Sequence, residues 1–351
     1  MRLSYTQREG NIRVNPRIIS IGYAFPDKYY TQSELFEMLG YKSPQVKRIF
    51  ENSGIKGRYL WTNPVGKSWQ ELTEEYEKAA IALSKKAVLN CMDGRSLSDI
   101  GCLIFSSCTG YTCPGVSHHL AKELDMPDDL IHTNLLGMGC EASSPALCRA
   151  IDYVETHEKM ALLVSCEPCS CAYFPAPESD LENTVTNCIF GDAAAAMLIG
   201  YDHNPHHPEI IDIQSYFNKE YMDYLGFKWV DGRLKCVLHK DVPKVSGMLV
   251  REAVYRLLGK NNLAVSDIDH WAVHPGGLRV LEEIQKALPV LPWKLKASYD
   301  VLRDIGNVSS ATVIIMGKEL NHVEPPAWGL GVTLGAGFEV GAVLLRWKEV
   351  K

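Results

Sequence analysis

The sequence of 351 residues lacks any run of about 18 or more uncharged apolar residues, which a membrane-spanning helix requires. Residues 1–8 contain no apolar core followed by a cleavage site, so they predict no secretory signal. An excess of positive charge is also missing, because 36 basic residues stand against 42 acidic ones. We therefore expect a cytoplasmic protein whose partners include neither a membrane nor a nucleic acid.

The sequence also lacks the pattern of a disulfide framework or a zinc site. Its 11 cysteines are an odd number in mostly apolar surroundings, which favours buried free thiols in a reducing compartment. Cys166 and Cys169 have the spacing of zinc ligands, but no second Cys/His pair follows at finger or ribbon spacing. Three histidines in residues 203–208 lie among prolines and polar residues, as in a surface loop. We expect no metal and no cofactor.

What the sequence does contain is an internal repeat. Residues 98–106 and 266–274, which lie 168 positions apart, both begin with Ser-Asp-Ile and continue as a buried strand. Each follows an amphipathic helix. Residues 139–144 and 306–311 match at an offset of 167, and each opens a run of small and apolar residues. Three features at nearly one offset favour duplication over chance.

The repeat predicts the fold class and the division of the chain. We expect an α/β protein, one compact body of stacked layers, with an N-terminal half in residues 1–200 and a C-terminal half in residues 201–351. The connecting segment, residues 201–244, is rich in aromatic residues and contains an Asp-Gly turn. We expect this segment to form one wall of a pocket.

Residues that can do chemistry lie at matching positions of the repeat. Cys140 pairs with Asn307, and the second repeated strand ends at His274, where Pro275 and two glycines stop regular strand pairing. If Cys140 opens a helix, the positive end of the helix dipole lowers the pKa of its thiol. We expect Cys140, His274 and Asn307 to converge in one site.

The order Cys, His, Asn also occurs in papain-like cysteine proteases. The separation of 134 residues between Cys140 and His274 lies near the range of that family, and Asn307 follows 33 residues later. However, the Cys-Gly-[Ser/Ala]-Cys-[Trp/Tyr] motif is absent, and the cysteines fit no secreted disulfide set. A protease is therefore the less favoured alternative, and peptide hydrolysis would distinguish it.

Several longer motifs give the sequence a resemblance to a known family. They are Arg58-Tyr59, Cys113-Pro114-Gly115, Gly139-Cys140, and residues 190–195, 240–243, 273–277 and 306–311. From about Arg48 to Trp347, the sequence resembles the thiolase-like condensing enzymes, and among them the chalcone-synthase-like type III polyketide synthases. The resemblance implies a thiolase-like five-layered αβαβα fold built from two duplicated halves, and a homodimer.

The resemblance also implies a set of roles. Cys140 would carry an acyl group from a thioester, while His274 and Asn307 donate hydrogen bonds to the carbonyl of an extender unit. Decarboxylation of a malonyl thioester leaves an enolate, which such donors stabilise. Ser309, in the same motif as Asn307, would contact the substrate. The substrates would be acyl-CoA and malonyl-CoA, or acyl-carrier-protein thioesters.

Some positions depart from the plant members of this family. The two gating phenylalanines match Ile211 and Cys236, and positions that are often threonine match Cys169 and Ala172. These changes predict a wider and more apolar pocket, suited to an aliphatic acyl chain. Cys113 matches the residue that reaches across the dimer into the partner's cavity.

The basic residues that grip the CoA phosphates in the plant enzymes are only partly kept. Arg48 remains, whereas the other two positions are Gln45 and Asn52, with Lys47 adjacent. The loss of two cations predicts weaker CoA binding, so a carrier-bound donor is an alternative. Compensation by Lys47 or Lys56 would leave CoA as the donor.

We therefore predict a condensing acyltransferase that loads an acyl thioester on Cys140 and extends it with malonyl units by decarboxylative Claisen condensation to a polyketide or pyrone. The nearest alternative joins two preformed acyl chains, at least one of them carrier-bound, into a diketone or α-pyrone. Glu141 is expected to point away from the thiol and to favour the positive helix end. Its alternative role is that of a base in a non-decarboxylative condensation.

Overall fold

The computed structural model describes residues 8–9, 12–13, 15–318 and 323–348. Its main feature is a mixed sheet of nine strands in the order β13-β14-β15-β10-β3-β9-β8-β6-β7. The strands are β3 (Arg17–Ala24), β6 (Ile100–Ser107), β7 (Ile131–Leu136), β8 (Met160–Pro168), β9 (Asp192–Gly200), β10 (Glu209–Phe217), β13 (His270–Val273), β14 (Ala327–Gly335) and β15 (Glu339–Trp347). A single residue pair, Glu209 with Arg17, joins β10 to β3, so the strands form two groups.

The two groups of strands repeat one pattern. In the first group, β3 pairs antiparallel with β9, β9 antiparallel with β8, and β8 parallel with β6. In the second group, β10 pairs antiparallel with β15, β15 antiparallel with β14, and β14 parallel with β13. The order and the directions agree for these four strands of each group, as the sequence repeat predicts, whereas β7, which pairs parallel with β6, has no counterpart beside β13 among the described residues.

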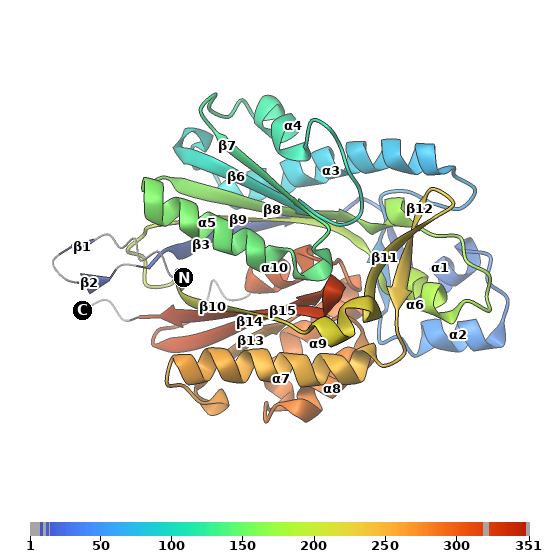
Figure 1. Cartoon of the computed structure of the whole chain (residues 1–351). Helices are drawn as coiled ribbons and strands as arrows, with labels where there is room; N and C mark the ends of the chain where they lie inside the picture. Colours follow the sequence, from blue (N-terminus) through green and yellow to red (C-terminus); the bar gives the residue numbers. More distant parts are fainter. Residues whose placement is uncertain (1–7, 10–11, 14, 319–322, 349–351) are drawn as a thin grey trace.

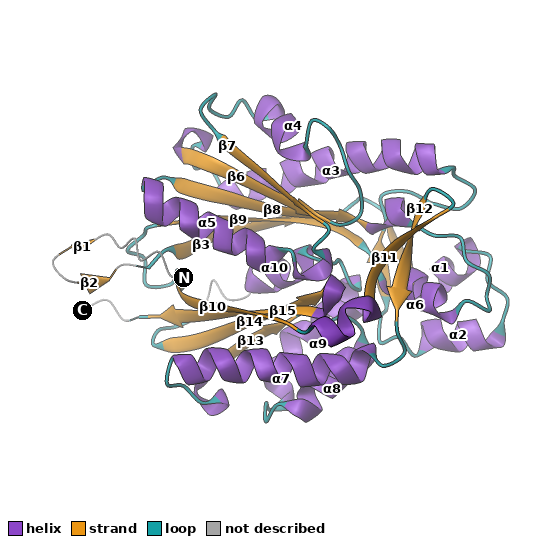
Figure 2. Ribbon diagram, in the orientation of Figure 1, coloured by secondary structure: helices purple, strands orange, loops and turns teal. Residues whose placement is uncertain are grey.

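Helices complete five layers around these strands (Figure 1). The helices α5 (Ser143–His157) and α10 (Ala311–Gly317) lie between the two groups and contact strands of both. The outer layers are formed by α3 (Trp69–Met92) and α4 (Val116–Glu123) on one side, and by α7 (Val242–Lys260) and α8 (Leu278–Ala287) on the other. Figure 2 shows the alternation of helix and strand layers. The predicted αβαβα architecture is confirmed.

The burial of the strands and helices follows from this layering. All residues of β6 and β9 are buried, as expected for strands covered on both faces. Helix α3 begins with a capping box formed by Ser68 and Glu71, which satisfies free N–H groups of its first turn. Its predicted apolar stripe is buried and consists of Leu72, Tyr76, Ala79, Leu83 and Ala87.

Smaller elements pack at one end of the layers, namely α1 (Gln32–Met38), α2 (Pro44–Glu51), α6 (Leu181–Ile189), β11 (Leu225–Val230) and β12 (Arg233–Leu238) (Figure 1). The remaining elements include the paired strands β4 (Tyr29–Thr31) and β5 (Gly57–Tyr59), and α9 (Lys296–Ile305), which contacts β5, α8 and β13. The predicted Asp231-Gly232 turn joins β11 to β12 as a hairpin. A short ladder of β1 (Arg8–Glu9) and β2 (Ile12–Arg13) lies near the start of the chain. Among the described helices, none has the length and apolar character needed to span a bilayer.

Candidate active site

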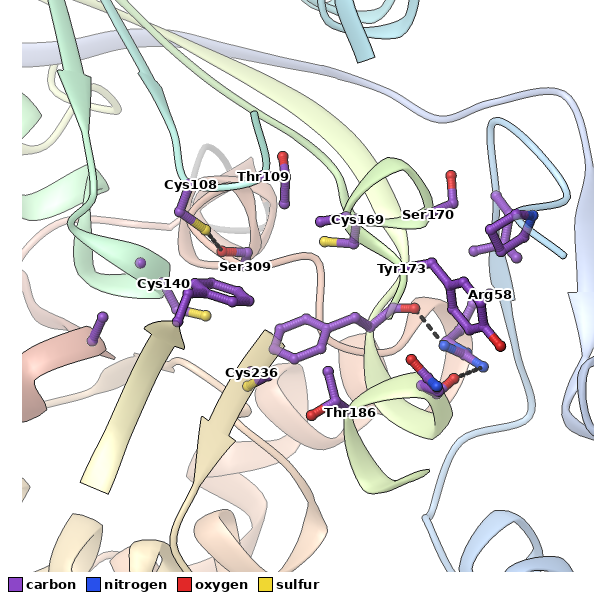
Figure 3. A pocket seen from close by; sticks show the side chains of 18 of the residues that line it. Arg58, Cys108, Thr109, Cys140, Cys169, Ser170, Tyr173, Thr186, Cys236 and Ser309 are labelled. Atoms are coloured by element: carbon purple, nitrogen blue, oxygen red, sulfur yellow. Dashed lines mark hydrogen bonds between the residues drawn. The ribbon is translucent and has the colours of Figure 1, made fainter. Parts of the chain in front are cut away.

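A cavity lies at the end of the layers where α1, α6, β11 and β12 pack. The empty space within it is about 820 Å³, and this volume includes space that is open to solvent. Residues of both halves line it, and Figure 3 shows that the Cys140 and Cys169 side chains point into the same space. The hairpin β11–β12 forms one wall with Leu225, Phe227 and Cys236. The segment between the halves therefore does wall a pocket, as its aromatic content predicts.

Cys140 reaches the cavity from a tight turn. The turn, a 3₁₀ helix at Gly139–Glu141, leads from β7 into α5. Gly139 adopts a φ of +61°, and a side chain at this position would lie 2.8 Å from the backbone nitrogen of Ala336. A glycine is thus required before the cysteine, because the turn packs directly against the chain that follows β14.

Asn307 and Ser309 lie beside the thiol. Both side chains are within hydrogen-bonding reach of Cys140. The Oδ1 atom of Asn307 accepts a hydrogen bond of 2.8 Å from the backbone N–H of Ser309, which leaves the Nδ2 group as the donor. Two backbone hydrogen bonds of 2.9 Å, with Ile189 and Gly191, hold Asn307 in place. The predicted convergence of Cys140 with Asn307 is present in the structure.

A buried glutamate, Glu167 on β8, joins the two halves behind these residues. One of its oxygens accepts hydrogen bonds of 3.0 Å from the Cys108 N–H and the Thr109 hydroxyl. The other accepts hydrogen bonds from the hydroxyls of Ser310 (2.6 Å) and Ser309 (3.2 Å). Glu167 therefore fixes the Ser309 loop against the Cys108 loop. The sequence analysis missed it, although a glutamate within an apolar strand was a visible signal.

His274 lies one residue beyond β13 and is 1% exposed. Its backbone N–H donates a 2.8 Å hydrogen bond to Val332 of β14, the strand that ends beside the Cys140 turn. Its Nδ1 atom is buried and has no hydrogen-bond partner among the described residues. His274 thus lies at the same end of the sheet as Cys140, and its contact with the thiol stays a prediction.

The comparisons with known proteins agree with this geometry. Residues 6–203 match the family model of the N-terminal domain of chalcone and stilbene synthases, and residues 225–348 match that of their C-terminal domain. The chain belongs to the chalcone and stilbene synthase family. It is a type III polyketide synthase, a condensing acyltransferase.

Known relatives match over nearly the whole chain. A 3,5-dihydroxyphenylacetyl-CoA synthase of Streptomyces toyocaensis is 30% identical, and the match covers 95% of this chain and 90% of the relative. The α-pyrone synthesis polyketide synthase-like Pks18 of Mycobacterium tuberculosis is 29% identical, with 89% and 84% covered. The crystal structure of 1,3,6,8-tetrahydroxynaphthalene synthase from Streptomyces coelicolor gives a TM-score of 0.88 at 25% identity, covering 95% of this chain and 100% of that one.

Burial sets the charge state of the Cys140 thiol in this type III polyketide synthase. It raises the pKa of Cys140 to about 12, although hydrogen bonds from Ser309 and Asn307 act in the opposite direction. Burial also lowers the pKa of His274 to about 3. The expected lowering of the thiol pKa by the helix end is therefore wrong for the resting site. Cys140 is a neutral thiol and His274 a neutral imidazole at pH 7.

Glu141 differs from its prediction in one respect. It does not line the cavity, in agreement with a side chain that points away from the thiol, but it is 1% exposed. Burial and the nearby charge of Glu339 raise the pKa of Glu141 to about 9. The carboxyl is therefore neutral at pH 7 and does not place a negative charge at the helix end. Its position outside the cavity also argues against a role as base.

The change Glu141→Gln is expected to alter how stability depends on pH. The carboxyl has a folded-state pKa of about 9 and an ordinary value of 4.5, so the folded protein binds the extra proton between these values. This group therefore makes the wild type less stable as pH rises from about 4.5 to 9, by several kcal/mol in total. The uncharged glutamine removes that loss. In urea unfolding at a series of pH values, the free energy of unfolding of the variant should rise relative to that of the wild type as the pH increases. If the two free energies change with pH in parallel, Glu141 is not a buried neutral acid.

The predicted substrate-binding residues divide into two groups. Cys169, Cys236 and Ser309 line the cavity, as expected. Ile211 does not, because it lies at a β-bulge of β10 and packs against the core of the second half. The cavity instead has Phe190 in its lining, which belongs to the conspicuous Phe-Gly-Asp-Ala motif. The predicted gate of Ile211 and Cys236 contains no aromatic residue, whereas the lining of the cavity includes Phe190.

Three other predicted residues lie on the surface. Lys47 and Arg48 are exposed on α2, and Lys47 forms an ion pair of 3.8 Å with Glu51. Cys113 is exposed in the loop between β6 and α4. None of the three lines the cavity, so a role for them requires a substrate that extends outside it or a second subunit.

Proposed function

We propose that this type III polyketide synthase loads an acyl thioester on Cys140 and extends it with malonyl units by decarboxylative Claisen condensation, to give a polyketide or pyrone. The position of Cys140 carries the proposal. Its thiol faces a largely apolar cavity that is partly open to solvent, with the Asn307 amide and the Ser309 hydroxyl within hydrogen-bonding reach. The Ser309 hydroxyl donates to Glu167, so the Nδ2 group of Asn307 is the fixed donor at the thiol. A nucleophile beside a fixed donor is the arrangement that acyl transfer requires.

Loading begins at the Cys140 thiol. His274 is neutral because burial lowers its pKa, so the lone pair of its imidazole is free to accept the proton of the thiol. The same burial makes the imidazole a weak base, so the proton moves to it while the sulfur attacks the carbonyl of the acyl thioester and forms a new C–S bond. The thiolate of the donor leaves, takes the proton back from His274 and departs as a thiol. The acyl group stays on Cys140, and both residues return to their neutral state.

Extension uses the same donors on a second thioester. The thioester carbonyl of malonyl-CoA accepts a hydrogen bond from Nδ2 of Asn307, and the imidazole of His274 is the second donor. The bond to the carboxylate breaks, carbon dioxide leaves, and the electron pair forms an enolate whose oxygen both donors stabilise. The enolate carbon attacks the acyl carbonyl on Cys140, and the C–S bond breaks with its electron pair on the sulfur. The Cys140 thiolate takes up a proton from solvent, and the product leaves as a thioester one ketide unit longer.

The cavity lining favours an apolar starter. Leucines and aromatic rings provide much of its wall: Leu35, Leu39, Leu60, Leu225, Phe190 and Phe227. Apolar surface of this kind stabilises an aliphatic acyl chain by about 25 cal/mol for each Å² removed from water. The Mycobacterium relative is named for α-pyrone synthesis, and a relative from Streptomyces peucetius is named a 1,3,6,8-tetrahydroxynaphthalene synthase. We propose an aliphatic acyl starter and a pyrone or polyketide product for this chain.

Intact-protein mass spectrometry tests this reaction directly. The protein is incubated with acyl-CoAs of increasing chain length, then with malonyl-CoA, and both the adduct and the released product are recorded. We expect an acyl adduct that malonyl-CoA discharges as a longer ketide or pyrone. An adduct that malonyl-CoA leaves untouched would instead support the coupling of two preformed chains, at least one carrier-bound.

We propose a homodimer that works in the cytoplasm. β7 is an edge strand with Ile131 45% exposed and Leu136 41% exposed. An open edge with apolar side chains is a surface that proteins cover, and a second copy would cover it by strand pairing. All 11 cysteines are free, which supports a reducing compartment. In the dimer, Cys113 would face the partner's cavity.

The change Arg48→Glu is expected to weaken binding of the thioester donor. Arg48 is exposed on α2, where a guanidinium can pair with CoA phosphates, and a carboxylate there repels them. We expect the KM for acyl-CoA to rise about tenfold with little change in kcat, because the group acts on ground-state and transition-state binding equally. Lys86→Glu, on a different helix, is the control. An unchanged KM would place phosphate recognition elsewhere.

A further inference from the structure

Arg58 on β5 is only 2% exposed, yet its hydrogen-bond partners are neutral. Its Nε atom donates to Oε1 of Gln32 at 3.2 Å, and Nη2 donates to the carbonyl of Asn187 at 3.0 Å. Nη1 donates to the carbonyl of Phe190, and Figure 3 shows both carbonyl contacts as dashed lines. A buried arginine usually pairs with a carboxylate, and the buried carboxyl of Asp192 does interact with Arg58 through its charge. However, Asp192 accepts its hydrogen bonds from Trp61 and Ser170, so the hydrogen bonds of Arg58 to neutral acceptors call for another explanation.

The two carbonyls belong to the C-terminal end of α6. The last carbonyls of a helix have no partner within it and carry the negative end of the helix dipole. Burial lowers the pKa of Arg58 to about 10, so the guanidinium keeps its charge at pH 7. Arg58 therefore caps α6 with a cation and fixes the chain where it leaves the helix at Phe190.

The residues on either side of Phe190 form backbone hydrogen bonds with Asn307. The Asn307 N–H donates to Ile189, and the Gly191 N–H donates to Asn307, both at 2.9 Å. The stem of Arg58 runs directly against this bridge. A Cβ atom at Gly306 would lie 2.8 Å from Cδ of Arg58, and one at Gly191 would lie 3.2 Å from its Cβ. The two glycines thus leave the space that Arg58 occupies beneath the Asn307 turn.

We propose that Arg58 is a positioning residue for the decarboxylation step. It fixes Phe190 and, through the two backbone hydrogen bonds of Asn307, holds the Nδ2 donor where the enolate oxygen forms. This inference rests on the proposed role of Asn307. A displacement of about 1 Å of such a donor costs about 100-fold in rate. Loading of Cys140 does not depend on Asn307 to the same degree, so the two steps should respond differently.

Arg58→Lys and Arg58→Gln test the proposal. Lysine keeps the charge, but its single ammonium cannot span the three acceptors of the guanidinium fork. For Arg58→Lys we expect kcat for malonyl-CoA decarboxylation to fall at least about tenfold, while its KM and the rate of acyl loading stay within about threefold. Arg58→Gln should lose more in the same step. Decarboxylation is followed as acetyl-CoA formation without starter, and loading by mass spectrometry of the acyl adduct.

Arg17 provides a matched control. It is 9% exposed and donates to two backbone carbonyls, at Asn204 (3.0 Å) and His207 (2.6 Å), and to Glu209. It pairs with Gly200 at the far end of β9, about 25 Å from the Asp192 end near Arg58. Arg17→Lys should lower the melting temperature without changing the ratio of decarboxylation to loading.

The ratio of the decarboxylation rate to the loading rate decides whether Arg58 positions Asn307. A wild-type ratio in Arg58→Lys, or an equal fall in both steps, would overturn the positioning role, whatever the melting temperature. If Arg58→Gln does not fold, Arg58→Lys with a wild-type circular dichroism spectrum provides the answer. A wild-type protein that neither loads nor decarboxylates would instead refute the proposed function, so the two failures are distinguishable.

Discussion

Replacing Cys140 with alanine is expected to abolish the covalent acyl adduct and to reduce product formation at least about 10⁴-fold. The covalent route divides one difficult condensation into two easier steps, and it requires the sulfur. Asn307 and His274 remain in the variant, so decarboxylation of malonyl-CoA should continue. Mass spectrometry for the adduct and acetyl-CoA formation for the decarboxylation measure the two activities on one preparation.

The controls for this prediction come from the same cavity. Cys108, Cys169 and Cys236 also line it, so each has access to the same acyl-CoA. Burial raises the pKa of each of these thiols, and that of Cys140 as well, so a low thiol pKa does not single out the nucleophile. What distinguishes Cys140 is the Asn307 amide beside it, because Ser309 lies against Cys108 as well. Alanine at any of the other three should leave the adduct on Cys140, whereas an adduct in Cys140→Ala would refute the assignment.

The fold could be predicted because the repeat consists of short sequence motifs that each indicate a local structure. Ser-Asp-Ile followed by an apolar run produces β6 in one half and β13 in the other, each after a long helix. The small residues after Cys140 and Asn307 predict the two central helices, which must be narrow to pack between two groups of strands. Matching positions in a duplicated chain then place Cys140 and Asn307 at the same end of the body.

The missed features depend on contacts that no local pattern records. Glu167 receives donors from two loops that are far apart in the sequence, so its role follows only from the tertiary structure. Glu141 is buried by its neighbours, whereas a position near a helix start suggests an exposed, charged side chain. Ile211 lies in a segment with few distinctive sequence motifs, whereas Phe190 belongs to the Phe-Gly-Asp-Ala motif. The pKa of Cys140 is set by burial, which outweighs the helix end.

Replacing Asn307 with alanine is expected to slow malonyl decarboxylation about 10²- to 10³-fold, the usual loss for one oxyanion donor. Loading of Cys140 should survive. Because Oδ1 of Asn307 also accepts the Ser309 N–H, alanine removes a structural bond together with the donor. Asn307→Asp separates these effects, since a carboxylate oxygen can keep the bond to Ser309 but cannot replace the Nδ2 donor. We expect both variants to lose decarboxylation, and the aspartate variant to keep the wild-type melting temperature more closely.

The control for the loss of an amide lies outside the cavity. The Nδ2 group of Asn261 donates to Leu257 at 2.8 Å and to Asp212 at 3.1 Å, at the end of α7. Asn261→Ala should lower stability and leave the ratio of decarboxylation to loading unchanged. If Asn307→Ala loses loading and decarboxylation by the same factor, Asn307 supports the site without acting on the enolate. Selective loss in both Asn307 variants assigns the stabilisation of the enolate oxygen to the Nδ2 donor.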